Sequence, residues 1–156
     1  MAKLQRQTDN LILMRKVLVL NGPNLGRLGS REPEIYGNLD FAALVAQVTE
    51  VAAEMGLQAD VRQSDSETDL VHWLHEAVDQ KLDVIINPAA FTHYSYALRD
   101  AAALVTSSGQ KLIEVHISNP HAREQFRHTS VISGVATGVI AGLGLKSYLL
   151  ALGAVV

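Results

Sequence analysis

The chain predicts an α/β protein, a doubly wound parallel sheet with helices on both faces that forms a single three-layer domain. Strand-like and helix-like segments alternate along the sequence, and parallel strands need such crossover helices to connect them. The length of 156 residues suits one domain, and 48% hydrophobic with 19% charged residues is typical of a compact globular protein. A second independent domain is not expected.

The first half of the chain predicts a strand, a long loop, a helix and a second strand. Residues 16–20 are apolar and rich in β-branched side chains, and they stop at the turn sequence Asn21-Gly22-Pro23. Residues 40–55 have the apolar periodicity of a helix, which Gly56 closes, and residues 57–62 alternate like a strand. The loop before the helix, about fifteen residues long, is of a length that is usually functional or disordered in compact domains.

The second half continues the same alternation. Residues 67–80 predict a helix, residues 83–86 a buried strand halted by Pro88, and residues 95–105 another helix. The remaining elements are a turn over 106–109, a strand over 111–116, and a last short strand and helix within 131–156. This order predicts the flavodoxin-like form of the doubly wound sheet.

The apolar segment 131–156 leaves a second reading open. Gly134, Gly138 and Gly142 have the four-residue spacing of packed transmembrane helices. Lys146 interrupts the segment and leaves only about 15 apolar residues before it, too few for an ordinary membrane span. We therefore favour a buried terminal helix and expect no membrane association.

The ends and the overall composition set further limits. Residues 1–14 contain charges and only a very short apolar run, unlike a secretory signal, and we expect them to be a disordered extension of a domain over 15–156. The net charge of −3 predicts no nucleic-acid partner. There is no cysteine, which excludes disulfides, thiolate catalysis and cysteine-ligated zinc and is compatible with the cytoplasmic location that we expect.

Polar clusters follow three of the predicted strands. In doubly wound sheets ligands bind outside the carboxyl ends of the strands, so these clusters are the candidate site. They comprise Asn21, Asn24, Arg27, Arg31 and Tyr36 after the first strand; Asn87, Thr92, His93, Arg99 and Asp100 after the third; and Glu114, His116, Ser118, Asn119, His121, Arg123 and Arg127 at the fourth.

Two side chains in these clusters suit acid–base chemistry. A tyrosine at its ordinary pKa is almost wholly protonated at neutral pH, but Arg27 or Arg31 in the same loop could stabilise the phenolate of Tyr36. The two-residue period of a strand puts Glu114 on the same face as His116, where its carboxylate could orient the imidazole. Each side chain taken alone is also compatible with an ordinary structural role.

Other classes of protein fit less well. His72 and His75 share a helix face, but they lack a third ligand at a recognisable spacing, and we expect no metal. The glycine-rich first loop lacks the ending of a P-loop and the dinucleotide spacing. A flavin-binding module would need a Ser/Thr-rich phosphate loop there, and a phospho-receiver would need aspartate in place of Asn87. A structural assembly protein built on the apolar C-terminus remains an alternative.

Five motifs carry a specific resemblance that covers nearly everything after Arg15. They are Asn21-Gly-Pro-Asn-Leu-Gly26, Arg31-Glu-Pro-x-Ile-Tyr36-Gly37, Arg62-Gln-Ser-Asp-Ser-Glu67, Asn87-Pro-Ala-Ala-x-Thr-His93 and Ile113-Glu-Val-His-Ile-Ser-Asn119. At these residues the chain resembles type II 3-dehydroquinate dehydratase, a family of the shikimate and quinate pathways. The resemblance implies a flavodoxin-like enzyme that dehydrates 3-dehydroquinate without a cofactor.

The resemblance also implies roles for individual residues. Tyr36 matches the base, Arg31 and Asn24 match its electrostatic partners, and His116 matches the proton donor to the leaving hydroxyl. The substrate-binding set that it implies is Asn87, His93, Arg127 and the backbone amides near Ile117 and Ser118.

Assembly and reaction class follow from the same resemblance. The family implies a dodecamer of trimers in which Asp100 reaches the site of a neighbouring subunit. It also implies an enolate route with no Schiff base, and the lysines all lie outside the three polar clusters: Lys3, Lys16, Lys81, Lys111 and Lys146.

Overall fold

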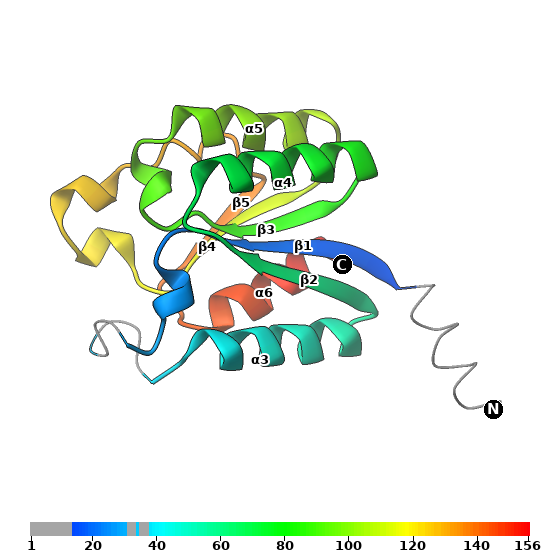
Figure 1. Ribbon diagram of the computed structural model, residues 1–156, viewed down its shortest axis with the longest axis horizontal. Coiled ribbons are helices and arrows are strands. Elements are labelled where there is room, and N and C mark those ends of the chain that lie inside the picture. Colours follow the sequence, from blue (N-terminus) through cyan, green and yellow to red (C-terminus); the bar gives the residue numbers. More distant parts are fainter. Residues whose placement is uncertain (1–13, 31–33, 35–37) are drawn as a thin grey trace.

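A five-stranded parallel sheet forms the centre of the molecule in the computed structural model, which describes residues 14–30, 34 and 38–156 (Figure 1). Its strand order is β2-β1-β3-β4-β5, which is the flavodoxin-like order, and every neighbouring pair is parallel. The strands are β1 (Arg15–Asn21), β2 (Leu57–Gln63), β3 (Asp83–Asn87), β4 (Leu112–His116) and β5 (Gly138–Ala141). The predicted fold class is confirmed. The expected extension over 1–14 lies outside the described residues except for Met14.

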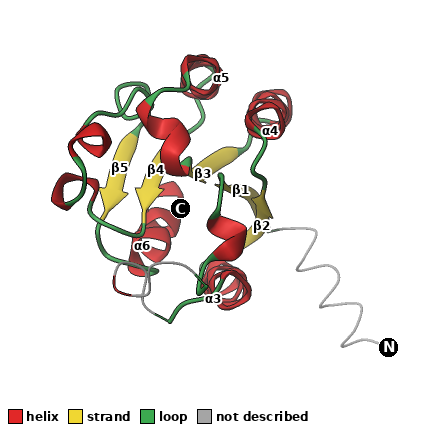
Figure 2. Cartoon of the chain, turned by 60° about the vertical axis from the view of Figure 1, so that its left-hand side comes forward, coloured by secondary structure: helices red, strands yellow, loops and turns green. Residues whose placement is uncertain are grey.

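Helices cover both faces of the sheet, which gives three layers (Figures 1 and 2). One face packs against α3 (Phe41–Glu54) and α6 (Lys146–Val155), and the other against α4 (Glu67–Gln80) and α5 (Tyr96–Ser107). Short 3-10 helices follow three of the strands: η1 (Leu25–Arg27), η2 (Ala89–His93), η3 (Pro120–Ala122) and η4 (Gln125–His128). The alternation of strand and helix in the sequence corresponds directly to this layering.

The apolar strands are buried on both sides. In β1, Val17 and Val19 face α3 and α6, whereas Leu18 and Leu20 face α4 and α5. A strand covered on both faces needs apolar residues at every position, which is why its sequence is a continuous apolar run. The central strands are therefore packed on both faces, and the loops that follow them start from well-packed strand ends.

Polar side chains cap the starts of three long helices. Asp40 accepts a hydrogen bond from the backbone N–H of Ala43 at 2.7 Å at the start of α3. Ser66 caps α4, and Ser95 caps α5 by accepting from the N–H of Leu98 at 3.0 Å. Each cap satisfies a backbone donor that a helix start leaves unpaired.

The apolar C-terminal segment forms β5, a turn and α6. In the part of the chain that the structure describes, no helix has the length and apolarity needed to cross a membrane. One side of α6 is instead buried against the sheet through Tyr148, Ala151, Leu152 and Val155. The buried-helix reading of this segment is confirmed.

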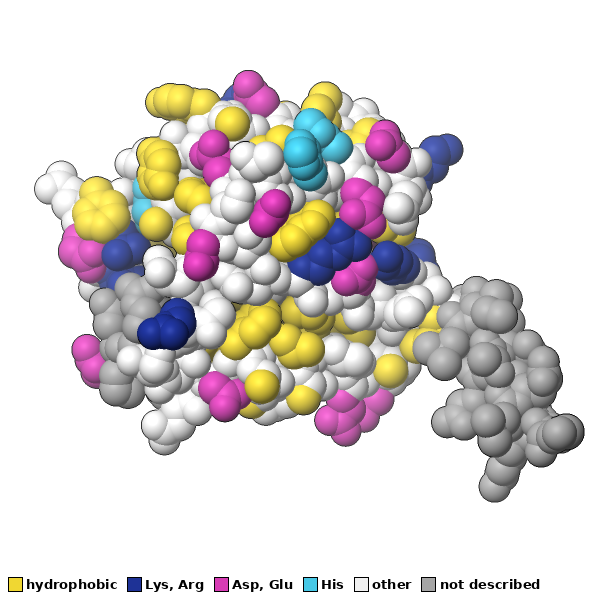
Figure 3. Space-filling model, in the orientation of Figure 1, with side chains coloured by type: hydrophobic (Ala, Val, Ile, Leu, Met, Phe, Trp, Pro, Cys, Tyr) yellow, Lys and Arg dark blue, Asp and Glu magenta, His cyan; other side chains and the backbone are white. Residues whose placement is uncertain are grey.

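The edge strand β2 is covered by charges. Arg62 forms ion pairs with Asp60 and Glu76, both at 2.7 Å, and its guanidinium lies 5.6 Å from the ring centre of Trp73. The carboxylates of Glu76 and Asp60 raise the pKa of Arg62 above its ordinary value. Figure 3 shows acidic and basic side chains side by side over β2 and α4. Such charges oppose pairing of this edge with a strand of another molecule.

The end of α4 supplies a test of backbone strain. Lys81 follows the helix in the left-handed region, with φ of 55° and ψ of 51°. Lys81→Gly should raise the free energy of unfolding by about 0.5–1 kcal/mol, because relief of left-handed strain exceeds the added backbone entropy. Chemical denaturation measures the change. Lys81→Ala keeps the Cβ and is the matched control; an equal gain in both variants would contradict the explanation.

Candidate active site

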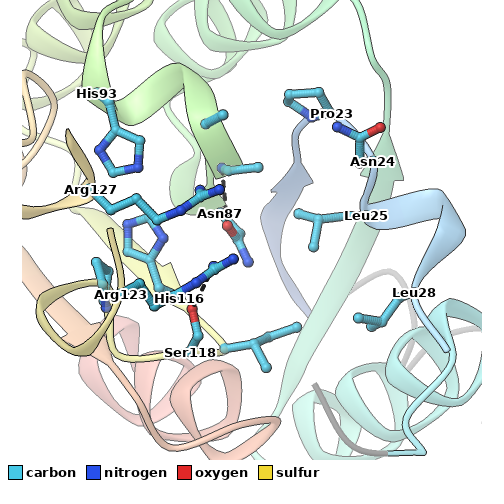
Figure 4. A pocket seen from close by; sticks show the side chains of 14 residues that line it. Pro23, Asn24, Leu25, Leu28, Asn87, His93, His116, Ser118, Arg123 and Arg127 are labelled. Atoms are coloured by element: carbon cyan, nitrogen blue, oxygen red, sulfur yellow. Dashed lines mark hydrogen bonds between the residues drawn. The ribbon is translucent and has the colours of Figure 1, made fainter. Parts of the chain in front are cut away.

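A pocket opens where β1, β3 and β4 end (Figure 4). Parallel strands present their carboxyl ends at one edge, so the three loops that follow them converge there. The pocket is lined by residues that the sequence places in the candidate site: Asn24, Asn87, His93, His116, Ile117, Ser118 and Arg127. The structure thus brings together side chains from all three polar clusters.

Of the predicted site residues that the structure describes, Glu114 and Asp100 do not line the pocket. Tyr36 and Arg31 lie outside the described residues. Asp100 lies on α5, where its side chain is 74% exposed and pairs with Arg99 at 2.8 Å. Its expected role in the site of a neighbouring subunit concerns a contact between chains, and the structure describes one chain.

Glu114 lies beneath the pocket and contacts His116. Its side chain is fully buried, and its Oε1 lies 2.7 Å from Nε2 of His116. An ionised carboxylate only accepts hydrogen bonds, so it requires the proton on Nε2 and leaves Nδ1 to exchange a proton with a ligand. The contact also stabilises the positive charge that the ring carries when both nitrogens are protonated.

Hydroxyl groups complete the surroundings of the buried carboxylate. Thr92 and Ser130 donate hydrogen bonds to Glu114 Oε1, the latter at 3.3 Å, and Ser133 donates to Oε2. Burial alone would raise the pKa of Glu114, but the hydrogen bonds from His116, Ser133 and Thr92 together hold it below its ordinary value. Glu114 is therefore an anion at neutral pH although it is buried.

His93 faces the pocket as a neutral ring. Burial lowers the pKa of His93, and the charge of Arg127 lowers it further, against the opposing effect of a hydrogen bond to Thr129. Its Nδ1 lies 2.8 Å from the carbonyl oxygen of Thr129. Because a carbonyl only accepts, the proton is on Nδ1, and Nε2 is left as a hydrogen-bond acceptor.

Asn24 has an unusual backbone conformation that the opposite loop supports. Its φ of 68° lies in the left-handed region, and its N–H donates to Oδ1 of Asp65 at 2.8 Å. Gln63 Nε2 donates to the same carboxylate oxygen at 3.0 Å and to the carbonyl of Gly22 at 3.2 Å. The motif over 62–67 therefore supports the start of the first loop and does not line the pocket itself.

Positive charge gathers at one side of the pocket. Arg127 donates through Nε to Glu124 at 2.8 Å, and its guanidinium lies 4.6 Å from the ring centre of Phe126. Arg123, a member of the third polar cluster to which the sequence assigned no role, also lines the pocket and donates to Ser118 Oγ at 3.2 Å. Its position four residues before Arg127 in the third polar cluster was the available signal. An anionic ligand suits this side of the pocket.

Two of the histidines lie on α4, away from the pocket. His72 and His75 are exposed on α4, with ring centres 6.3 Å apart. Among residues 14–30, 34 and 38–156, no group of three or more His, Asp or Glu side chains is arranged to hold a metal ion.

Comparison with known proteins gives the family. The sequence model of dehydroquinase class II matches residues 15–156. The chain belongs to the class II dehydroquinase family. A 3-dehydroquinate dehydratase of Salinispora tropica is 56% identical over 137 residues, which are 88% of this chain and 94% of that protein. One of Mycobacteroides abscessus is 57% identical over 136 residues, which are 87% and 92% of the two chains.

Solved structures agree with this membership. The type II dehydroquinase of Propionibacterium acnes superposes with a TM-score of 0.87 at 52% identity, covering 90% of this chain and 95% of that one. That of Butyrivibrio crossotus gives a TM-score of 0.87 at 45% identity, covering 91% and 97%. As a class II dehydroquinase the chain is an enzyme, a dehydratase that acts without a Schiff base.

The buried Glu114 gives this class II dehydroquinase a pH-dependent contribution to stability. The folded-state pKa of Glu114 lies below its unfolded value, so the contribution is complete above the unfolded pKa and is lost as pH falls through the folded one. Glu114→Gln should lower the free energy of unfolding by about 1.5–3 kcal/mol at neutral pH, the value of hydrogen bonds to a charged group. The difference in the free energy of unfolding between Glu114→Gln and wild type should become smaller as the pH falls.

Urea denaturation from neutral pH to well below the ordinary glutamate pKa of 4.5 measures that difference. Glu50→Gln, a change on the exposed surface of α3, is the matched control and should cost little at any pH. A destabilisation by Glu114→Gln that stays constant over the whole range would contradict an ionised Glu114.

Proposed function

We propose that this pocket removes water from 3-dehydroquinate to give 3-dehydroshikimate, in the shikimate or quinate pathway, with Tyr36 as base and His116 as acid. The observation that carries the proposal is the contact between His116 and the buried carboxylate of Glu114 at the floor of an arginine-lined pocket. It supplies a proton donor that is held in one orientation beside a site for an anion. Membership of the class II dehydroquinase family supplies the reaction.

The reaction is an elimination through an enolate. Tyr36, as the phenolate stabilised by Arg31, takes the proton from the carbon between the ketone and the carbon that bears the hydroxyl. The electron pair moves into the carbonyl to form the enolate, and a water held by Asn24 donates a hydrogen bond to the enolate oxygen. The carbon–oxygen bond then breaks while His116 donates its proton, so that hydroxide leaves as water. Each of these groups contributes about two to four powers of ten in rate.

The other pocket residues hold the substrate. Arg127, with the backbone N–H groups of Ile117 and Ser118, binds the carboxylate, because a guanidinium and amides together satisfy its oxygens. Asn87 and His93 bind ring hydroxyls. His93 acts as an acceptor through Nε2, in line with the proton that its contact to Thr129 keeps on Nδ1. No step in this scheme needs a metal or an organic cofactor.

We propose further that residues 15–156 form a single catalytic domain, that the protein is cytoplasmic, and that it assembles as a dodecamer of trimers. Large apolar side chains exposed on the single chain, such as Leu104 and Leu143, support burial between copies. The exposed position of Asp100 on α5 is compatible with a contact to a neighbouring subunit.

Tyr36→Phe should reduce kcat to less than about a hundredth of the wild-type value, because it removes the proton acceptor and keeps the ring. Substrate binding should stay nearly intact. Formation of the conjugated enone product, followed by its absorbance, gives the rate. Tyr96→Phe on the exposed surface of α5 is the matched control. Turnover by Tyr36→Phe near the wild-type rate would remove Tyr36 as the base.

Asp100→Ala should weaken assembly and activity together, because the charge that Asp100 meets in a neighbouring subunit would be left without its partner. When the variant is diluted, the mass measured by light scattering and the turnover rate should fall together. Both should fall at a higher protein concentration than they do for wild type. Asp79→Ala, an exposed change on α4, is the control. A fully active Asp100→Ala monomer, or a monomeric wild type at assay concentration, would refute the shared site.

A further inference from the structure

A buried chain of polar side chains runs from the sheet to the pocket on the side opposite Glu114. Its centre is Tyr148 of α6, which is fully buried in the apolar layer between α3, α6 and the sheet. The Tyr148 hydroxyl contacts Asn21 at the end of β1 at 2.7 Å and Asn87 at the end of β3 at 2.9 Å. These two asparagines are direct neighbours in the parallel register. Tyr148 has no part in the proposed mechanism, and packing of its ring in the core does not require the hydroxyl.

The direction of each hydrogen bond in this chain follows from the carbonyls at its far end. Asn21 Nδ2 lies 3.1 Å from the carbonyl oxygen of Arg62 and 3.4 Å from that of Val19. A carbonyl only accepts, so the amide nitrogen of Asn21 must face these atoms and its Oδ1 must face Tyr148. The Tyr148 hydroxyl therefore donates to Asn21 Oδ1.

The orientation of Asn87 is then determined. A phenol has one proton, and Tyr148 gives it to Asn21, so its oxygen can only accept from Asn87 Nδ2. Burial raises the pKa of Tyr148, which keeps the hydroxyl protonated. At the other end of the same amide, Asn87 Oδ1 accepts from the backbone N–H of Ala89 at 3.1 Å. Both partners demand the same orientation of the Asn87 amide.

We propose that Tyr148 is a positioning residue for the dehydration reaction, which fixes the amide of Asn87 so that its second Nδ2 hydrogen is presented to the substrate. Asn87 lies at the centre of the pocket, between His116 and Leu25 in Figure 4. The inference rests on the proposed function, in which Asn87 binds a substrate oxygen. In the fixed orientation, the Nδ2 group of Asn87 donates a hydrogen bond to a substrate oxygen. In the reversed orientation, Asn87 Oδ1 would face that substrate oxygen and repel it.

A purely structural role for Tyr148 makes a different prediction. If the hydroxyl only links α6 to the ends of β1 and β3, its loss destabilises the fold and acts independently of the Asn87 side chain. If it acts through Asn87, its effect on substrate binding disappears when the Asn87 amide is absent. A double-mutant cycle on the steady-state constants separates the two cases.

The experiment uses the intact protein with Tyr148→Phe, Asn87→Ala, the double variant and Tyr96→Phe as the exposed matched control. Tyr148→Phe should raise KM for 3-dehydroquinate about tenfold, the effect of one hydrogen bond of ordinary strength. Its kcat should stay within about twofold of wild type, because the groups that transfer protons are untouched. The double variant should have the same KM as Asn87→Ala alone, and the control should match wild type.

Three results would overturn the proposal, and they differ in meaning. A raised KM in Asn87→Ala with a wild-type KM in Tyr148→Phe, or independent effects in the double variant, would remove the positioning role and leave the proposed function standing. An unchanged KM in Asn87→Ala would remove Asn87 from substrate binding, and the positioning role with it.

A second variant keeps the proposal open to refutation if Tyr148→Phe does not fold. Asn21→Leu has a similar volume and removes the acceptor of the Tyr148 proton, so the Tyr148 hydroxyl is no longer fixed as an acceptor for Asn87. The Asn87 amide then keeps only the N–H of Ala89 as a fixed partner, and KM should rise toward that of Tyr148→Phe. A folded Asn21→Leu variant with wild-type KM would overturn the proposal.

Discussion

The architecture of this site depends on one buried charge, the carboxylate of Glu114. A carboxylate without access to water must be surrounded by donors, or it takes up a proton. The donors come from three separate parts of the chain: Thr92 in η2, Ser130 and Ser133 in the segment before β5, and His116 at the end of β4. Satisfying this one anion therefore joins the loops after β3 and β4 and orients the imidazole above it.

A second buried network, without net charge, lies on the other side of the pocket. There Tyr148 joins Asn21 and Asn87, and the parallel register of β1 and β3 sets these asparagines side by side. The pocket thus lies between an ionic network that holds His116 and a neutral one that holds Asn87. Placing both on the carboxyl ends of buried strands gives each side chain a rigid base.

The sequence predicts most of the fold because each element has a clear local pattern. The continuous apolar run of β1 and the capping residues of α3 and α5 are local signals, and alternation along β4 is enough to place Glu114 beside His116. Contacts between distant segments leave no such signal. The pairing of Asp65 with the Asn24 backbone is one case, and Tyr148, which reads as one more apolar residue of the last helix, is another. The proposed role of Asp100 involves a second chain, and neither local patterns nor contacts within one chain indicate it.

The charge distribution explains how a buried anion can lie close to a pocket for an anionic substrate. The charge of Glu114 is shared among four hydrogen bonds, one of them from His116, which stands between the carboxylate and the pocket. The positive charge of Arg127 lies on the pocket wall, and the neutral ring of His93 adds none. In the proposed reaction, therefore, Arg127 binds the substrate carboxylate, and Glu114 acts on the substrate through the proton that His116 carries. Because Arg127 lies on the pocket wall and Glu114 lies behind His116, the pocket can attract an anion while Glu114 stabilises the positive charge of a protonated His116 ring.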